Sequence, residues 1–186
     1  MEKVAVFIDG ANMFHGLKTD FSRIDIDYEK LVNKLVSGRQ LTRVYYYSAL
    51  PNQQRDPERY SRQQKFLNAL DRKPYFKVVL GRLEPRPGGL YVEKGVDIAL
   101  AIDMVDLAYN DIYDTAILIS GDGDFSKAVE VIQRRGKHVE NVGTPSSLSN
   151  NLRSTCDIVT VLDSSYLSTC WRAQNGTHSL AALSPE

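Results

Sequence analysis

The fold is decided by the stretch Ile117-Leu118-Ile119-Ser120-Gly121-Asp122-Gly123-Asp124-Phe125. An apolar run that ends at Ile119 is typical of a buried strand, and the glycine-rich turn after it leads at once into a helical pattern that starts at Phe125. A strand that enters a helix through such a turn leaves polar side chains at its carboxyl end, where α/β sheets bind ligands. We therefore expect Asp122 and Asp124 at a ligand-binding edge.

These two aspartates are two residues apart, so both can face one point if the turn is extended. Like charges held that close repel by several kcal/mol at low effective dielectric unless a cation or proton lies between them. A hard divalent ion such as Mg²⁺ or Mn²⁺ is the natural ligand of such a pair. The alternative is structural, with Asp124 only capping the helix and Asp122 only serving the turn.

The composition is that of a soluble globular protein, with 42% hydrophobic and 25% charged residues in a chain of 186. We predict one domain over residues 1–171 and a flexible tail over residues 172–186. The chain shows neither a signal pattern nor a run of about 20 apolar residues, which predicts a cytoplasmic protein without membrane contact. Cys156 and Cys170 lack the spacing of a zinc site and are expected to be free thiols.

The formal net charge is zero, which argues against a general polyanion binder, but the charges are unevenly distributed. Residues 51–94 hold ten Lys and Arg against five Asp and Glu, whereas residues 95–130 hold one against eight. This pattern suits an acidic metal pocket beside a basic substrate surface, and solvated faces would also produce it.

Strand patterns alternate with helical patterns along most of the chain, which predicts a three-layer α/β/α sandwich on a mostly parallel sheet. The strands are expected at 3–8, 41–50, 75–80, 114–119, 137–142 and 157–162, and the helices at 27–38, 56–72, 95–109, 125–135, 144–153 and 164–171. Asp9 follows the first strand and becomes a neighbour of Asp122 and Asp124 if their strands adjoin. The Pro and Gly residues within 81–94 predict a hairpin, which could either cover a groove as a flap or project from the surface without a role in binding.

The helix expected at 95–109 is apolar except for three aspartates, so we expect it to be buried on most of its circumference. Buried carboxylates must be paired or bound to a metal. At about 100° per residue, Asp97 and Asp106 project to opposite sides, so these aspartates cannot all serve one ion. Asp97 is the preferred ligand, Asp103 is a weaker candidate and Asp106 is expected to face outward.

Several other polar residues are candidates for binding a phosphate backbone. Asn12 can cap the segment after Asp9 or orient a water or phosphate there. The basic candidates are Arg55, Arg59 and Arg62, spaced as one helical stripe, together with Lys94 in the hairpin. Ser146 and Ser147 stand at an expected helix start, where a phosphate can bind. A solvated helix face and ordinary capping are the structural alternatives for these two groups.

Three motifs together resemble the NYN domain family, in particular its LabA-like bacterial members, within the PIN-like nuclease superfamily. They are Asp9-Gly10-Ala11-Asn12, Lys94-Gly95-Val96-Asp97 with Asp103 six residues on, and Ser120-Gly121-Asp122-Gly123-Asp124-Phe125. The resemblance covers about residues 3–162 and implies a PIN-like fold and a metal-dependent RNase chemistry. It assigns acidic roles to Asp9, Asp97, Asp122 and Asp124, and matches Asn12 and Ser120 to polar positions.

The resulting hypothesis is an endoribonuclease that cuts RNA with Mg²⁺ or Mn²⁺, with Asp9, Asp97, Asp122 and Asp124 at the ions. The rival is a non-catalytic regulatory module that binds RNA or a protein partner through the same groove. A small phosphatase or nucleotidase is less favoured, because an Asp-x-Asp pair is expected after its first strand and this chain has Ala11 there. A homodimer or a regulatory protein partner is a further expectation.

Overall fold

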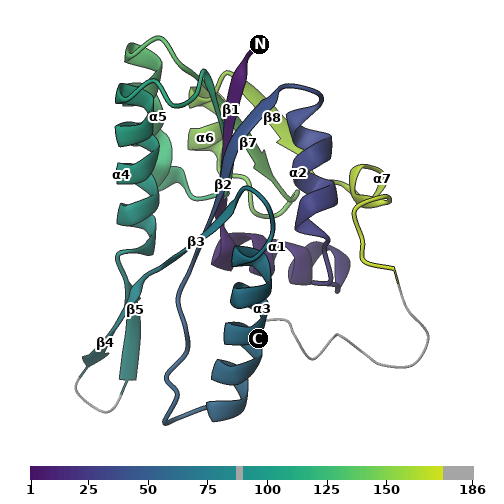
Figure 1. Ribbon diagram of the computed structural model, residues 1–186, viewed down its shortest axis with the longest axis vertical. Helices are drawn as coiled ribbons and strands as arrows, with labels where there is room; N and C mark the ends of the chain where they lie inside the picture. The colour runs from purple at the N-terminus through teal and green to yellow at the C-terminus, as the bar shows by residue number, and fades with distance from the viewer. Residues whose placement is uncertain (87–89, 174–186) are drawn as a thin grey trace.

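The structure, a computed structural model, describes residues 1–86 and 90–173, and for residues 82–86 and 90–94 it describes the backbone alone. Six parallel strands form the main sheet in the order β3-β2-β1-β6-β7-β8 (Figure 1). They are β1 Lys3–Asp9, β2 Gln40–Ser48, β3 Phe76–Leu80, β6 Thr115–Ile119, β7 His138–Gly143 and β8 Ile158–Val161. The predicted parallel α/β architecture is therefore confirmed.

Helices cover both faces of this sheet, and Figure 1 shows α4 and α5 on one side and α2 and α7 on the other. The helices are α1 Gly10–Phe21, α2 Tyr28–Val36, α3 Pro57–Asp71, α4 Val96–Tyr109, α5 Ser126–Arg134, α6 Asn150–Thr155 and α7 Ser164–Leu167. A short 3-10 helix, η1 Gly123–Phe125, precedes α5. Within the described ranges, no helix is long and apolar enough to cross a bilayer.

Side-chain alternation along β1 decides which face each residue joins. Val6 and Ile8 belong to the core under α1, α2 and α3, whereas Phe7 belongs to the core under α4, α5 and α6. Successive side chains of a strand point to opposite faces, so Asp9 falls on the same face as Phe7. The same alternation along β6 places Ser120 on the face of Leu118. The candidate residues of both strands thus lie under α4 and α5.

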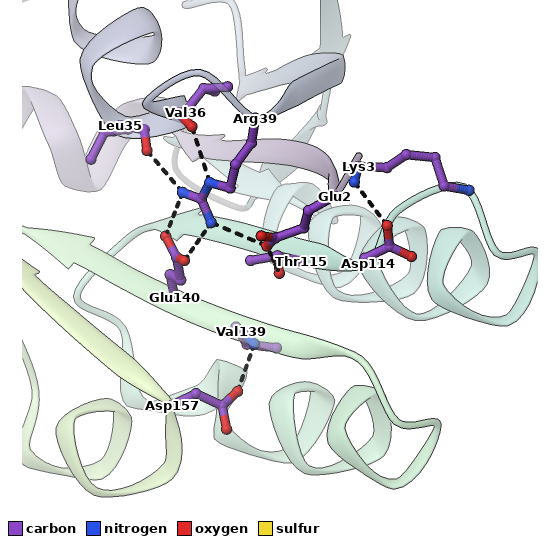
Figure 2. Close-up of polar contacts among 10 residues, drawn as sticks. All are labelled: Glu2, Lys3, Leu35, Val36, Arg39, Asp114, Thr115, Val139, Glu140 and Asp157. Atoms are coloured by element: carbon purple, nitrogen blue, oxygen red, sulfur yellow. Dashed lines mark hydrogen bonds and ion pairs between the residues drawn. The ribbon is translucent and has the colours of Figure 1, made fainter.

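Polar contacts fasten the amino ends of the strands, as Figure 2 shows. Arg39 binds Glu140 with a 2.6 Å ion pair and also contacts Glu2 at 3.3 Å. The backbone nitrogen of Lys3 donates to Asp114 Oδ2 at 2.8 Å. These contacts tie strands β1, β6 and β7 together at one end of the sheet. Because the strands are parallel, fixing their starts also aligns their carboxyl ends, where the candidate residues lie.

Three local predictions differ from the structure. The sequence pattern did not assign α1, which begins directly after β1 because Asp9 caps it by accepting from the backbone nitrogen of Asn12. The helix expected from 144 begins only at Asn150, since Ser147 folds residues 144–147 into a turn and Ser149 provides the cap. Helix α7 ends at Leu167 rather than near residue 171.

The predicted hairpin is present as the antiparallel pair β4 Arg82–Arg86 and β5 Leu90–Lys94, and its turn lies outside the described residues. In Figure 1 it projects past the carboxyl ends of the strands on the side of α4. The predicted tail also lies outside the described residues from 174 onward. Just before it, Trp171 pairs with Ile26 and packs its ring 4.3 Å from the Arg23 guanidinium, which anchors this part of the chain.

Candidate functional site

Asp9 ends β1 and is 5% exposed. Its Oδ1 accepts from the backbone nitrogen of Asn12 at 3.0 Å, and its Oδ2 accepts from Ser120 Oγ at 2.9 Å. Burial has the largest effect on this carboxylate and raises its pKa, and the nearby charge of Asp122 raises the pKa further. The hydrogen bonds from Asn12 and Ser120 act in the opposite direction and lower it. Asp9 is therefore a carboxylate whose ionised form is costly in the folded chain.

The turn after β6 lies directly against the turn after β1. Strands β1 and β6 are neighbours in the sheet, with Ile8 paired to Ile119. Asp9, which ends β1, and the turn of Asp122 and Asp124, which follows β6, therefore lie side by side. Asn12 Oδ1 accepts from the backbone nitrogen of Gly121 at 2.9 Å. Ser120 Oγ accepts from the backbone nitrogen of Asp122 at 3.2 Å while it donates to Asp9. One hydroxyl group therefore joins the two turns.

Asp97 approaches these turns from the first turn of α4. Its pKa is raised chiefly by partial desolvation, and then by the charges of Asp9, Asp122 and Asp124. Asp97 and Asp124 are exposed, whereas Asp122 is half-buried. The preferred acidic candidates thus lie close enough to perturb one another at the carboxyl edge of β1 and β6.

Asp122 has a structural role beside any chemical one. Its Oδ1 accepts from the backbone nitrogen of Asp124 at 3.0 Å and caps η1. The residue that caps the helix is therefore Asp122, whereas the structural alternative from the sequence places the cap at Asp124. The hydrogen bond from the Asp124 nitrogen fixes the direction of the Asp122 carboxylate at the edge of the sheet.

Asp103, the weaker candidate, lies two turns further along α4 and is half-buried. Its Oδ2 accepts from Tyr47 Oη at 2.8 Å. Burial and this carboxylate together raise the pKa of Tyr47, so the phenol stays protonated and keeps donating. The contact joins α4 to β2, and a metal-binding role for Asp103 stays a prediction.

Among the residues whose side chains are described, no three His, Cys, Asp or Glu form a group that could enclose a metal ion. The four aspartates are near enough for their charges to interact, yet Asp9 and Asp122 use oxygens in the hydrogen bonds described above. The site is consequently an open set of oxygen donors rather than an assembled cage.

The basic candidates are more dispersed than their spacing predicted. Arg55 is exposed in the turn before α3 and not on the helix, and Arg59 is exposed in its first turn. Arg62 lies 3.9 Å from Glu58, an ion pair that satisfies part of its charge. The side chain of Lys94 lies outside the described residues. The single predicted stripe is therefore reduced to Arg59 and Arg62.

The two serine candidates differ in their surroundings. The backbone nitrogen of Ser146 donates to Asp20 Oδ2 at 3.0 Å, so this amide already has an anionic acceptor. Ser147 lies against the acidic turn, because a Cβ built on Gly121 would lie 1.7 Å from the Ser147 carbonyl oxygen. Only a residue without a side chain fits at position 121. The loop that contains Ser147 therefore packs directly against the acidic turn and borders the site.

The structure adds Asn141, which the sequence analysis did not single out. This buried residue of β7 donates from Nδ2 to the Ser120 carbonyl oxygen at 2.7 Å and to that of Leu118 at 3.2 Å. Asn141 therefore fixes the end of β6 from the neighbouring strand. An amide two residues after Val139, at a position of the strand that faces the same core, was the available signal.

A parallel sheet with helices on both faces and aspartates at the carboxyl ends of adjacent strands fits a PIN-like α/β protein. A model of the NYN domain matches residues 3–163. The chain therefore belongs to the NYN domain family, as its motifs predicted.

Individual relatives agree with this assignment. The chain is 29% identical over 161 residues to the low amplitude and bright protein LabA of Synechococcus elongatus, covering 83% of this chain and 81% of that protein. It is 26% identical over 159 residues to an uncharacterised protein of Methanocaldococcus jannaschii, covering 84% of this chain and 54% of the archaeal protein. A crystal structure of a Vibrio parahaemolyticus protein of unknown function is similar, with a TM-score of 0.70, 28% identity, and coverage of 87% of this chain and 93% of that one.

Proposed function

We propose that this protein is a Mg²⁺- or Mn²⁺-dependent endoribonuclease whose reaction takes place at the carboxyl edge of β1 and β6. The observation that carries the proposal is the convergence of Asp9, Asp97, Asp122 and Asp124 at one edge of the sheet, where β1 adjoins β6 and the other three carboxylates are near enough to act on Asp97. Mutual repulsion of this kind is relieved by a bound cation. Clusters of perturbed carboxylates are typical of functional sites.

The donor set suits these ions. Carboxylate oxygens are hard ligands, and Mg²⁺ commonly keeps several waters and uses one or two carboxylates together with substrate phosphates. An open arrangement without a three-residue cage is compatible with that mode of binding. Asp9, Asp97, Asp122 and Asp124 would hold the ion directly or through water. When bound, the ion would lower the pKa of a water and neutralise charge on the phosphodiester.

The remaining residues hold this arrangement in place. Ser120 Oγ donates to Asp9 and keeps one carboxylate oxygen directed at the adjacent turn. Asn12 couples the two turns through Gly121. Arg59 and Arg62 carry positive charge on α3, whose first turn in Figure 1 lies beyond the carboxyl edge, where a phosphate backbone would need it.

Cleavage of a labelled single-stranded RNA with Mn²⁺ tests the proposal. Asp97→Asn should lower the rate by at least about 100-fold, since a charged ligand in the reacting site is lost. Asp106→Asn, on the exposed side of the same helix, is the matched control and should cleave like the parent. A chelator should stop the reaction of the parent. If Asp97→Asn cleaves at the parent rate, the proposed chemistry is wrong.

A non-catalytic RNA- or protein-binding module is the second candidate. It is favoured by the zero net charge and by the open donor set of the described residues. Binding of the same RNA by fluorescence anisotropy, with no product after prolonged incubation in Mn²⁺, would favour this function over the enzyme.

A further inference from the structure

The outer side of α4 carries an apolar seam that nothing in the described chain covers. Among the residues whose side chains are described, eight large apolar side chains are exposed, and four of them are Ile98, Ile102, Tyr109 and Ile112. Ile98, Ile102 and Tyr109 are 65%, 61% and 55% exposed. The expectation that α4 is buried on most of its circumference is therefore wrong. Its buried side consists of Val96, Leu100, Met104 and Ala108.

The spacing of this seam is that of a helix-pairing surface. Steps of four, three, four and three residues connect Ile98, Ile102, Val105, Tyr109 and Ile112. At about 100° per residue, the four that lie on the helix fall within an arc of about 60°. Alternating steps of three and four are the a and d positions of a heptad, which normally pack against a second helix. In Figure 1, α4 lies at the outer margin of the molecule, where a second helix has access.

The surface beside the seam is hollow enough to receive side chains. A groove of about 550 Å³ runs along it and is lined by Ala101, Ile102, Val105, Asp106, Tyr109 and Ala128. Ala101 of α4 and Ala128 of α5 are small, so the groove between these helices has room for side chains of an opposing helix. Asp106 marks the polar rim. An exposed apolar patch with a polar rim is characteristic of an interaction surface.

The charges at the two ends of the seam favour a second copy of this chain as the partner. One end, at the start of α4, carries Asp97 beside Asp122 and Asp124. The other end carries Arg135, whose guanidinium lies 5.5 Å from the Tyr109 ring and 3.7 Å from Asp111, and whose side chain stays 44% exposed. A second copy placed antiparallel across a two-fold axis brings each acidic end against the exposed side of Arg135, and also aligns the helix dipoles favourably.

We propose that α4 is the interface of a symmetric antiparallel homodimer, with the axis between Ile102 and Val105. In that arrangement Ile98 of one copy faces Tyr109 of the other. The exposed seam side chains offer on the order of 100 Å² each, so apolar contact buries roughly 800 Å² and the polar rim brings the total near 1,200 Å², the lower limit of stable interfaces. The apolar contacts of this interface do not depend on the proposed nuclease chemistry, although Asp97 at its acidic end is shared with the proposed site.

Light scattering after size-exclusion chromatography tests the interface. The full chain at about 100 µM, which populates a dimer whose dissociation constant is micromolar, should have twice the 20.9 kDa mass of one copy. Ile102→Glu should halve that mass, because two carboxylates would meet beside the axis. Ile158→Glu is the matched control, since Ile158 is 53% exposed on the edge strand β8, and it should stay dimeric. A monomeric parent, or a dimeric Ile102→Glu, overturns the proposal.

The orientation has its own test. A mixture of Ile98→Cys and Tyr109→Cys chains should form an intermolecular disulfide under mild oxidation, because these positions face each other across the axis. Ile98→Cys alone should not, and the parent chain reports any background from half-buried Cys156. Cross-linking of Ile98→Cys with itself would instead indicate a parallel pair and overturn the antiparallel arrangement. Equal thermal melting of variants and parent at low concentration excludes loss of fold as the cause.

Discussion

The side-chain oxygen of Asn12 accepts a hydrogen bond from the backbone nitrogen of Gly121, 2.9 Å away and 109 residues along the chain. The backbone nitrogen of Asn12 at the same time donates to Asp9. This residue therefore couples the two turns that carry the acidic side chains. The geometry of the site depends on this contact between turns as well as on the aspartates themselves.

Asn12→Ala should lower the free energy of unfolding by roughly 1–2 kcal/mol, because the Gly121 amide loses its acceptor in a partly buried place. Urea unfolding followed by circular dichroism measures the change. Asn68→Ala, on the exposed side of α3, is the control and should change stability by less than about 0.5 kcal/mol. Equal effects of the two substitutions would show that the contact between the turns contributes nothing.

Gly121→Ala should destabilise the protein by at least about 2 kcal/mol, because the new Cβ would lie 1.7 Å from the Ser147 carbonyl oxygen and one of the two loops must move. Gly123→Ala is the control two residues away, where the nearest atom is the Asn151 side-chain nitrogen at 3.2 Å. Thermal unfolding should separate the two variants clearly. A Gly121→Ala protein as stable as Gly123→Ala would mean that the loop yields without cost.

Removal of the Asp97 charge should have opposite effects with and without metal. The folded chain raises the pKa of Asp97, so the charge of Asp97 destabilises the folded state relative to the unfolded state above the folded pKa, and Asp97→Asn should raise the melting temperature in the presence of a chelator. Mn²⁺ should raise the melting temperature of the parent more than that of Asp97→Asn, since a ligand of the folded state stabilises it. Asp106→Asn should respond to Mn²⁺ like the parent. Identical shifts in all three proteins would exclude Asp97 from metal binding.

Asp114 should contribute stability at neutral pH and lose it in acid. The Lys3 backbone nitrogen, followed by the charge of Lys137, lowers the pKa of Asp114 below its ordinary value of 3.8. A carboxylate with a lowered folded pKa stabilises the fold above its unfolded pKa, and the gain disappears as pH falls through the folded value. The melting temperature of Asp114→Asn should therefore lie below that of the parent at pH 7, and the two should converge as pH falls below the ordinary value of 3.8 and through the folded value. A constant difference across this range would contradict the assignment.

Most elements of the fold could be predicted from local pattern. The end of β6 at Ile119, the end of β1 within one residue of the predicted Ile8, and the amphipathic helix from Tyr28 follow from periodicity over a few residues, which backbone geometry imposes directly. Helix α1 was missed because its cap, Asp9, is also the last residue of a strand, and the local pattern assigned only one of these roles.

The sequence by itself determined the class of fold, the family motifs and the position of Asp9 and Asp122 after buried strands, because each depends on residues near one another along the chain. Only the tertiary structure decided that β1 adjoins β6, that Asn141 supports Ser120, and that the outer side of α4 stays uncovered. These relationships arise from packing between segments about 20 to more than 100 residues apart. An apolar sequence pattern predicts that a surface is favourably removed from water. Which segment covers that surface, in this chain or in another copy, depends on how the chain packs.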